Sequence, residues 1–191
     1  MIRNACAVLM CSRGTPMFLA GDEFGNTKFG NNNSYCQDNI TSWLDWSMLE
    51  KNKDLFEFFK FMIDYRKKHP VIRKKLDNAV CGMEAMHAHD VNAERMEVPQ
   101  NAKTLAVSFA GYDRKKGKDD LVYVAVNAYW EEVKITLPNL ANHGAWYLSV
   151  DTYGDEKGKY FYQEGEEIRI DREYVMKPRS IVVFTGREIL R

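Results

Sequence analysis

The chain has 191 residues, enough for one ordinary domain or for a small domain plus part of another. Hydrophobic residues make up 45% and charged residues 28%, a balance that predicts a folded core and excludes intrinsic disorder. The 27 Lys and Arg residues equal the 27 Asp and Glu residues, so no overall charge attracts nucleic acid or an anionic membrane. We therefore expect neither partner.

Cysteine usage and hydropathy bear on the compartment. The four cysteines, Cys6, Cys11, Cys36 and Cys81, have neither the density of a disulfide scaffold nor the paired spacing of a zinc site. No apolar run approaches the roughly 18 residues of a membrane span, and the first residues lack a secretory signal pattern. We expect free thiols, a reducing cytoplasmic environment and no membrane insertion.

The first quarter of the chain predicts a helix, a buried strand and a long loop. Residues Asn4–Ser12 are apolar at helical spacing, without a cap before them, as at a cut end. Thr15–Ala20 is a continuous apolar run between two glycines, typical of a parallel-sheet strand buried on both faces. Asp22–Trp46 then mixes Gly, Asn, Asp, Ser and aromatics without an apolar period, which predicts a functional loop far longer than the median of about 4–6 residues.

The clearest helix is expected at Asp54–His69. Its apolar residues recur three and four positions apart, and we expect Pro70 to end it. The last turn, Arg66–His69, carries four basic side chains where the helix dipole favours cations. We interpret this basic turn as a solvated helix end rather than a binding patch.

The sequence pattern of the second half of the chain is typical of an antiparallel β-domain. Short runs rich in β-branched and aromatic residues alternate with glycine-containing turns, and no helical pattern lies between them. This spacing predicts a β-sandwich of about 110 residues. The expected strands are Leu105–Phe109, Leu121–Asn127, Glu132–Leu137, Trp146–Asp151, Glu167–Asp171 and Ile181–Phe184.

Asp22 and Glu23 follow the predicted buried strand, at the end where barrel enzymes collect their functional residues. Adjacent residues of a strand point in opposite directions, so these two carboxylates are not expected to share one scissile bond. They either orient the backbone of the following loop or contact a sugar directly. The loop itself combines amides, carboxylates and aromatic rings, a mixture that binds sugars through hydrogen bonds and stacking.

The stretch Gly14–Gly25, the asparagine-rich run Gly30–Asn39, the helix end Arg66–Pro70 and the closing run Pro178–Phe184 together resemble glycoside hydrolase family 13. The asparagine-rich run is similar to the isoamylase-type glycogen debranching enzymes of that family. The resemblance extends over essentially the whole chain. It implies a mainly β protein, with an antiparallel β-sandwich at residues 78–191 preceded at residues 1–77 by an α/β segment from the end of an incomplete (β/α)8 barrel.

The resemblance also implies a function. Such an enzyme hydrolyses α-1,6 branches of glycogen by a retaining mechanism, with a nucleophile and an acid/base carboxylate about 5–5.5 Å apart. The family places those groups on earlier barrel strands, so no catalytic residue is expected in this chain, which alone should be inactive. Arg169–Asp171 and His89–Asp90 mimic family motifs but follow the barrel segment instead of preceding it. No cofactor is implied.

Four residues of the loop, Asn32, Asn33, Tyr35 and Asp38, are the expected contacts to an α-glucan such as glycogen or a limit dextrin. The competing interpretation is that Asn and Asp here only stabilise turns by bonding their own backbone. Asp22 and Glu23 are assigned to orienting the loop.

Two other functions stay open. The β-domain could be a non-catalytic glucan-binding module that uses its aromatic side chains, or a purely structural cap on the barrel.

His87 and His89 share one face if their segment is a strand, but nothing completes a metal site there. The apolar barrel segment is expected either to self-associate with the same segment of a second copy or to be poorly ordered.

Overall fold

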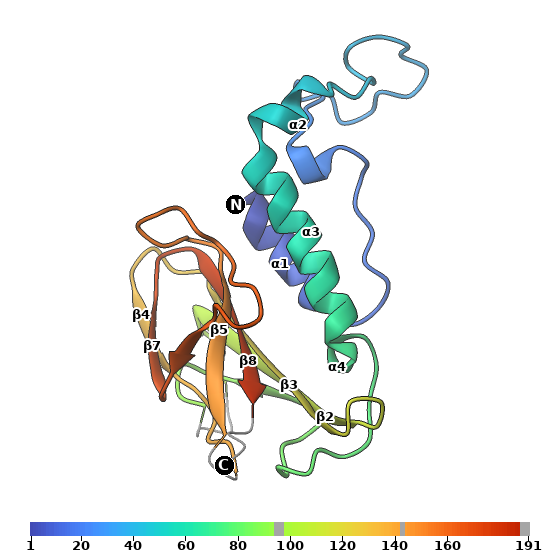
Figure 1. Ribbon diagram of the computed structural model, residues 1–191. Coiled ribbons are helices and arrows are strands. Elements are labelled where there is room, and N and C mark those ends of the chain that lie inside the picture. The colour runs from blue at the N-terminus through green and yellow to red at the C-terminus, as the bar shows by residue number, and fades with distance from the viewer. Residues whose placement is uncertain (94–97, 142–143, 188–191) are drawn as a thin grey trace.

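The computed structural model describes residues 1–93, 98–141 and 144–187. Its helical part runs along one side of a β-sheet (Figure 1). The helices are α1 (Ile2–Cys11), the 3-10 turn η1 (Asp22–Phe24), α2 (Ser47–Lys51), α3 (Lys53–Lys68) and α4 (Pro70–Arg73). The strands are β1 (Met86–His89), β2 (Thr104–Asp113), β3 (Lys118–Asn127), β4 (Val133–Thr136), β5 (Ala145–Asp151), β6 (Ile168–Ile170), β7 (Glu173–Met176) and β8 (Ser180–Arg187).

Two antiparallel sheets form the β part, which confirms the predicted mainly β class. The larger sheet has the order β1-β2-β3-β8-β5-β6, and β4 pairs with β7 in the smaller one. Five of the six predicted strands overlap the observed ones closely, and the sixth, Glu167–Asp171, shortens to β6. The sequence pattern missed β1 and β7, because each has only four residues, too few for their alternating burial to stand out.

Alternation along the strands separates two apolar cores. On β3, Val122 and Val124 face the helices, whereas Leu121 and Tyr123 face the small sheet. The period of two therefore gives each face of the large sheet its own set of buried side chains. The second core is closed by residues of β4 and β7, among them Ile135 and Met176.

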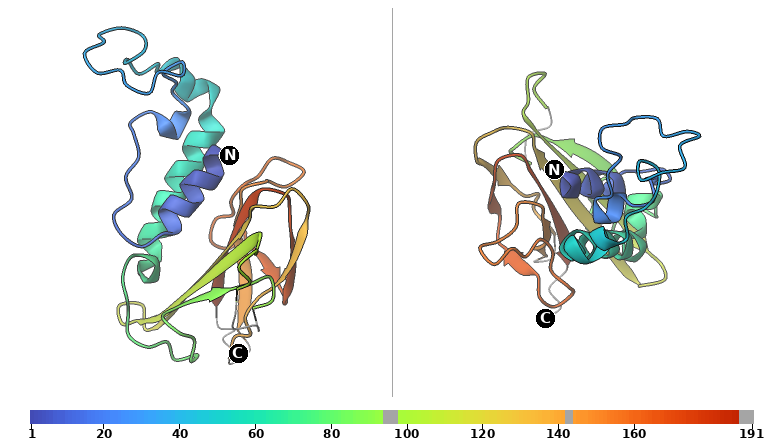
Figure 2. Two further views of the ribbon diagram at one scale, coloured as in Figure 1. Left: turned by 180° about the vertical axis from the view of Figure 1, so that it is seen from behind. Right: turned by 90° about the horizontal axis from the view of Figure 1, so that it is seen from above.

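Helices α1 and α3 cover the other face of the large sheet, as the three views agree (Figures 1 and 2). Their buried side chains, including Met10, Phe58 and Met62, belong to one cluster with Val150 of β5 and Val183 of β8. This shared core crosses the position between residues 77 and 78. The domain boundary expected there stays a prediction.

The strand predicted at Thr15–Ala20 is wrong. These residues are extended but pair with no other segment of the described chain, and Met17 and Leu19 are 85% and 55% exposed. A parallel strand requires neighbouring strands along its edges, and the described residues offer none to it. The local sequence therefore favours a strand here, but no distant segment of the described chain pairs with it.

The end of α3 also differs from its expectation. The helix ends at Lys68, and Pro70 begins α4, where a missing amide hydrogen costs nothing. Arg66 is not solvated: it is 6% exposed, and its guanidinium donates to the carbonyl oxygens of Met10, Ser12 and Gly14 at 2.7, 2.7 and 2.6 Å. This side chain therefore donates hydrogen bonds to carbonyl oxygens in the last turn of α1 and just after it.

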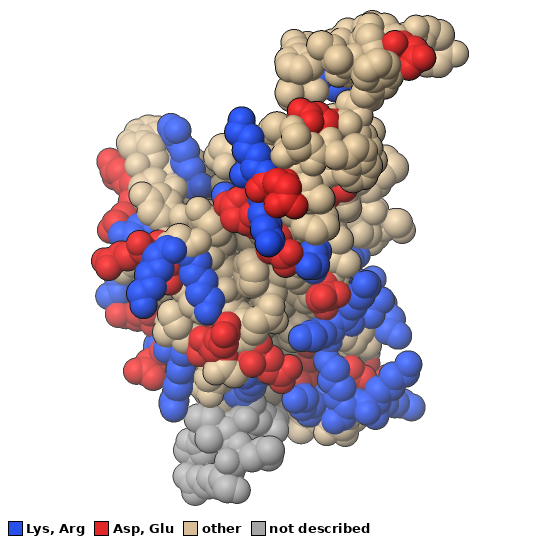
Figure 3. All heavy atoms as spheres, turned by 45° about the horizontal axis from the view of Figure 1, so that its top comes forward, with Lys and Arg blue, Asp and Glu red and all other residues tan. Residues whose placement is uncertain are grey.

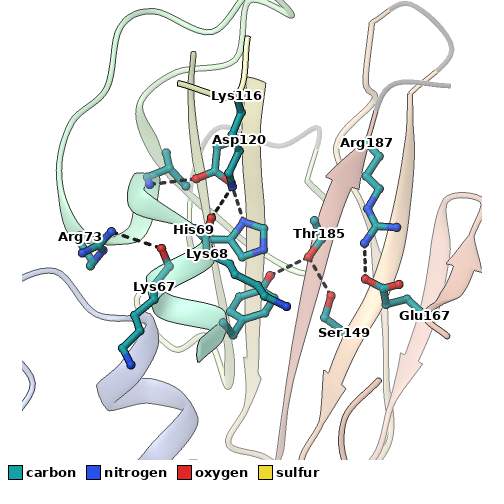
Figure 4. Close-up of polar contacts among 12 residues, drawn as sticks. Lys67, Lys68, His69, Arg73, Lys116, Asp120, Ser149, Glu167, Thr185 and Arg187 are labelled. Atoms are coloured by element: carbon teal, nitrogen blue, oxygen red, sulfur yellow. Dashed lines mark hydrogen bonds and ion pairs between the residues drawn. The ribbon is translucent and has the colours of Figure 1, made fainter. Parts of the chain in front are cut away.

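Polar contacts also connect the helices to the sheet (Figure 4). The Tyr65 hydroxyl lies 2.8 Å from Thr185 Oγ1, which lies 2.8 Å from Ser149 Oγ. Burial raises the pKa of Tyr65, so the phenol stays protonated and can donate. His69 Nδ1 lies 2.5 Å from Asp120 Oδ1, a partner supplied by β3. The predicted solvated turn is thus fixed to the sheet at His69.

Candidate functional site

The long segment between η1 and α2 extends away from the sheet, beyond the helices (Figure 1). Its two ends are tied together, because the Asp45 amide donates to Asn26 Oδ1 at 2.9 Å. The Asn52 side chain holds the start of the loop by donating to the Phe24 carbonyl at 2.9 Å. Gly21, at φ +101°, lets the chain turn where a Cβ would lie 2.7 Å from Asn26 Cβ.

Asp22 and Glu23 lie in η1 rather than at the end of a strand. The Asp22 carboxylate accepts the Leu19 amide at 3.0 Å, and the Glu23 carboxylate accepts the Gly21 amide at 2.8 Å. Both carboxylates therefore bind backbone of the turn that leads into the loop. Their assignment to orienting the loop fits these contacts, and a direct sugar contact stays a prediction.

Asparagine side chains build the first half of the loop. The Asn33 amide donates to Asn31 Oδ1 at 2.8 Å, and the Tyr35 amide donates to Asn33 Oδ1 at 3.1 Å. These are side-chain bonds to the backbone two residues on, which make a turn without regular structure. Asn32 and Asn33 are exposed, and Tyr35 is 84% exposed. The side-chain amide nitrogen of Asn33 and the ring of Tyr35 remain open to a ligand.

An indole and a carboxylate fix the second half. The Trp43 indole donates to Asp38 Oδ1 at 2.7 Å, and the Ser42 hydroxyl donates to the Ser34 carbonyl at 3.0 Å. Trp46 packs on Phe24 with ring centroids 5.6 Å apart. The contact between Trp43 and Asp38 could not be found by the sequence pattern, because a five-residue separation in a loop has no periodic signature.

The structure therefore places the four predicted residues on one protruding, internally bonded loop with their side chains at its surface. Glycosidic acid/base chemistry requires two carboxyl groups about 5–5.5 Å apart, whereas the bond that fixes Asp38 comes from an indole. Hydrogen bonding from Ser47 lowers the pKa of Asp45 nearby, so that carboxylate stays ionised. The loop offers hydrogen-bonding groups and rings, which suits binding rather than bond cleavage.

The two segments that mimic family motifs belong to the ends of strands β1 and β6 of the larger sheet rather than to this loop. His89 and Asp90 are buried at the end of β1, where His89 Nε2 contacts Ser108 Oγ at 2.9 Å. Burial lowers the pKa of His89. Asp171 follows β6 and its side chain is 95% exposed.

Residues 1–93, 98–141 and 144–187 contain no group of three His, Cys, Asp or Glu side chains suited to holding a metal ion. The rings of His87 and His89 lie 4.7 Å apart, but both nitrogens of His89 face protein atoms. None of the helices in these ranges has the length and apolar character needed to cross a bilayer.

Cys6 and Cys11 are free thiols buried under α3, and burial raises the pKa of each to about 12. Both side chains therefore stay protonated and act as small apolar groups of the first core.

Comparison with known proteins gives consistent relatives. A family model described as isoamylase, C-terminal, matches residues 82–185. Over 97% of this chain, an isoamylase of a Flavobacterium species is 31% identical, and the match covers 25% of that protein. A glycogen operon protein GlgX homolog of Mycobacterium bovis is 51% identical over 39% of this chain and 10% of its own length.

Among solved structures, type I pullulanase from Bacillus subtilis in complex with maltose superposes with a TM-score of 0.69 and 23% identity. That alignment covers 96% of this chain and 23% of the pullulanase, and it supports the fold. The chain thus spans a tenth to a quarter of the length of these relatives. Because the family model matches more than half of the 191 residues, this chain belongs to the isoamylase C-terminal family.

Proposed function

We propose that this chain is the C-terminal part of a cytoplasmic debranching enzyme that hydrolyses α-1,6-glucosidic branches of glycogen or a related α-glucan. The observation that carries the proposal is the exposed loop, in which Asn32, Asn33, Tyr35 and Asp38 present amide, phenol and carboxylate groups. Sugar hydroxyls are bound by such groups, and sugar faces stack on aromatic rings. The isoamylase names of the relatives support the reaction class.

In this proposal the loop binds and orients substrate, and the bond is broken elsewhere in the enzyme. A retaining mechanism needs a nucleophile and an acid/base carboxylate about 5–5.5 Å apart. The carboxylates of Asp22 and Glu23 are occupied by backbone amides, and Asp38 accepts an indole bond. We therefore place the catalytic pair outside this chain and expect the chain alone to be inactive.

The purified 191-residue chain tests the second half of the proposal. It should release no reducing ends from glycogen above a blank prepared from the same expression host without the chain. Release that increases with the amount of chain, and that disappears with Asp38→Ala or Glu23→Gln, would contradict the assignment. That outcome would place a catalytic carboxylate in the loop.

The rival is a glucan-binding β-domain. Its strongest support is Trp130, which is 63% exposed and packs against Tyr129 with tilted rings whose centroids lie 4.2 Å apart. Titration of the whole chain with a branched maltodextrin distinguishes the two sites. Loop binding predicts that Tyr35→Ala weakens affinity and Trp130→Ala does not, whereas the rival predicts the reverse.

Self-association also belongs to the proposal. Met17 and Leu19 lie exposed on an extended segment without a paired edge, and exposed apolar edges favour association. Light scattering of the chain should show concentration-dependent dimers that Met17→Ser with Leu19→Ser removes. Dimers unchanged in that variant would locate the contact elsewhere.

A further inference from the structure

A basic groove lies where the helices meet the β2–β3 hairpin. Three short basic segments line it: Lys67–Lys68 at the end of α3, Arg73–Lys75 at and just after the end of α4, and Arg114–Lys116 in the hairpin turn. These segments hold eight of the 27 Lys and Arg residues, in a groove of about 710 Å³. Figure 3 shows Lys and Arg gathered over this region, at the lower right of the view. No sequence window contains this cluster, because 49 residues separate its outermost members.

Few carboxylates neutralise the groove. Of the residues that line it, only Asp77 and Asp113 are acidic. Asp77 pairs with Arg114, and Asp113 accepts the amide of Lys115 at 2.9 Å within its own turn. In the described ranges, Lys68, Lys74, Lys75 and Lys115 have no ion pair with a carboxylate. The groove is thus strongly positive in a chain whose net charge is zero.

Bonds between the three segments hold the groove in place (Figure 4). Lys116 Nζ donates to the Lys68 carbonyl, and Arg73 donates to the Lys67 carbonyl at 3.3 Å. Asp120 fixes the turn between α3 and α4 through the Val71 amide at 3.1 Å. Like charges held together repel one another, so this arrangement costs stability unless an anion compensates it.

We propose that the groove binds a small anion carrying two or more phosphate groups, such as a sugar bisphosphate or a nucleoside polyphosphate. Ammonium groups bind phosphate as point charges, and the formal excess of six positive charges suits several phosphates. The volume lies within the range of about 300–1,000 Å³ that is usual for small-ligand sites. Tyr112, Pro70 and Leu76 supply an apolar wall for the uncharged part of the ligand.

Binding would have a structural consequence, because the three segments belong to both layers of the fold. A ligand held by Lys68, Lys75 and Lys115 connects α3, the segment after α4 and the β2–β3 turn. It therefore resists separation of the helices from the sheet and raises the melting temperature. This effect does not depend on glucan binding by the loop.

Calorimetric titration of the 191-residue chain with sodium tripolyphosphate tests the proposal. We expect binding of about one ligand per chain, weakened about tenfold or more in the triple variant Lys68→Gln/Lys75→Gln/Lys115→Gln. The matched control Lys51→Gln/Lys53→Gln/Lys157→Gln removes the same charge from exposed lysines outside the groove and should bind as the parent does. Equal weakening in both variants would overturn the proposal, since it would mean a diffuse charge effect.

Two further arms sharpen the result. Sodium chloride at the same ionic strength should not reproduce the rise in melting temperature that tripolyphosphate gives, and reproduction by salt would overturn the proposal. Hexose bisphosphate and ATP compete against tripolyphosphate, and displacement by either supports the site and identifies its ligand class. Displacement by a single-stranded oligonucleotide alone would overturn it in favour of a nucleic-acid surface. If circular dichroism shows that the triple variant is unfolded, the single variants Lys75→Gln and Lys115→Gln are compared with the parent instead.

Discussion

Replacing Phe58 with Ala tests whether the helices and the large sheet share one core. Phe58 lies in α3 and is fully buried, and its ring centroid lies 6.3 Å from that of Phe161, which follows β5. Phe61 stacks on the same ring at 4.5 Å, so Phe161 contacts two side chains of one helix. Truncation leaves a cavity between elements that are distant in sequence.

The expected loss is about 3–5 kcal/mol of unfolding free energy, the usual cost of a buried Phe→Ala change. Phe56→Ala is the matched control, because Phe56 is on the same helix but only half-buried; its loss should be about 1 kcal/mol or less. Urea unfolding gives both values. Hydrogen exchange of the Val122 and Val183 amides shows whether the sheet is affected too. Unchanged sheet protection in Phe58→Ala would refute the shared core, since only the helices would then have loosened.

Three further predictions concern polar contacts. Tyr65→Phe leaves Thr185 and Ser149 bonded to each other and should lower the free energy of unfolding by about 0.5–1.5 kcal/mol. Thr185→Val leaves both neighbours without their partner and should lower it by about 1–3 kcal/mol. A larger loss for Tyr65→Phe than for Thr185→Val in urea unfolding would contradict the network. Arg66→Met removes three bonds to carbonyl oxygens and should cost about 1.5–3 kcal/mol in the same assay, and a loss below about 0.5 kcal/mol would mean that the carbonyls find water. Burial lowers the pKa of His89 below the unfolded value of about 6.5, so its contribution to stability is present above pH 6.5 and lost as pH falls. Unfolding free energy should therefore drop more between pH 7.5 and 5 in the parent than in His89→Gln, and equal drops would count against this.

Local patterns predicted those parts of the fold that depend on neighbouring residues. The run of β-branched and aromatic residues at Leu121–Asn127 indicated a strand, and the apolar spacing over Asp54–His69 indicated a helix; both formed within a few residues of the expected bounds. Thr15–Ala20 failed because a parallel strand depends on partners distant in sequence. A buried Arg66 could not be told from a solvated one, since its three acceptors lie more than 50 residues away.

The candidate site, like the fold, could be predicted from the sequence only in part. Composition alone indicated a functional loop at Asp22–Trp46, and the asparagine side chains do shape it. The bond between Trp43 and Asp38 needed coordinates, because no sequence rule relates an indole to a carboxylate five residues away. The basic groove was divided among three segments that each look like an ordinary solvated surface, and only the fold brings them together.

The proposed contact between the loop and an α-glucan is tested most directly by kcat/KM on a branched α-glucan, measured for loop variants of the complete debranching enzyme that we propose contains this chain. Asn33→Ala and Asp38→Ala should each lose about 1–3 kcal/mol of transition-state binding, while the exposed controls Asn101→Ala and Asp171→Ala should lose none. Trp43→Phe removes the indole bond to Asp38 but keeps the carboxylate, so it separates substrate contact from loop shape. We predict a smaller loss in Trp43→Phe than in Asp38→Ala. Unchanged kcat/KM in both loop variants, or an equal loss in Trp43→Phe and Asp38→Ala, would contradict the claim and leave these residues a structural role.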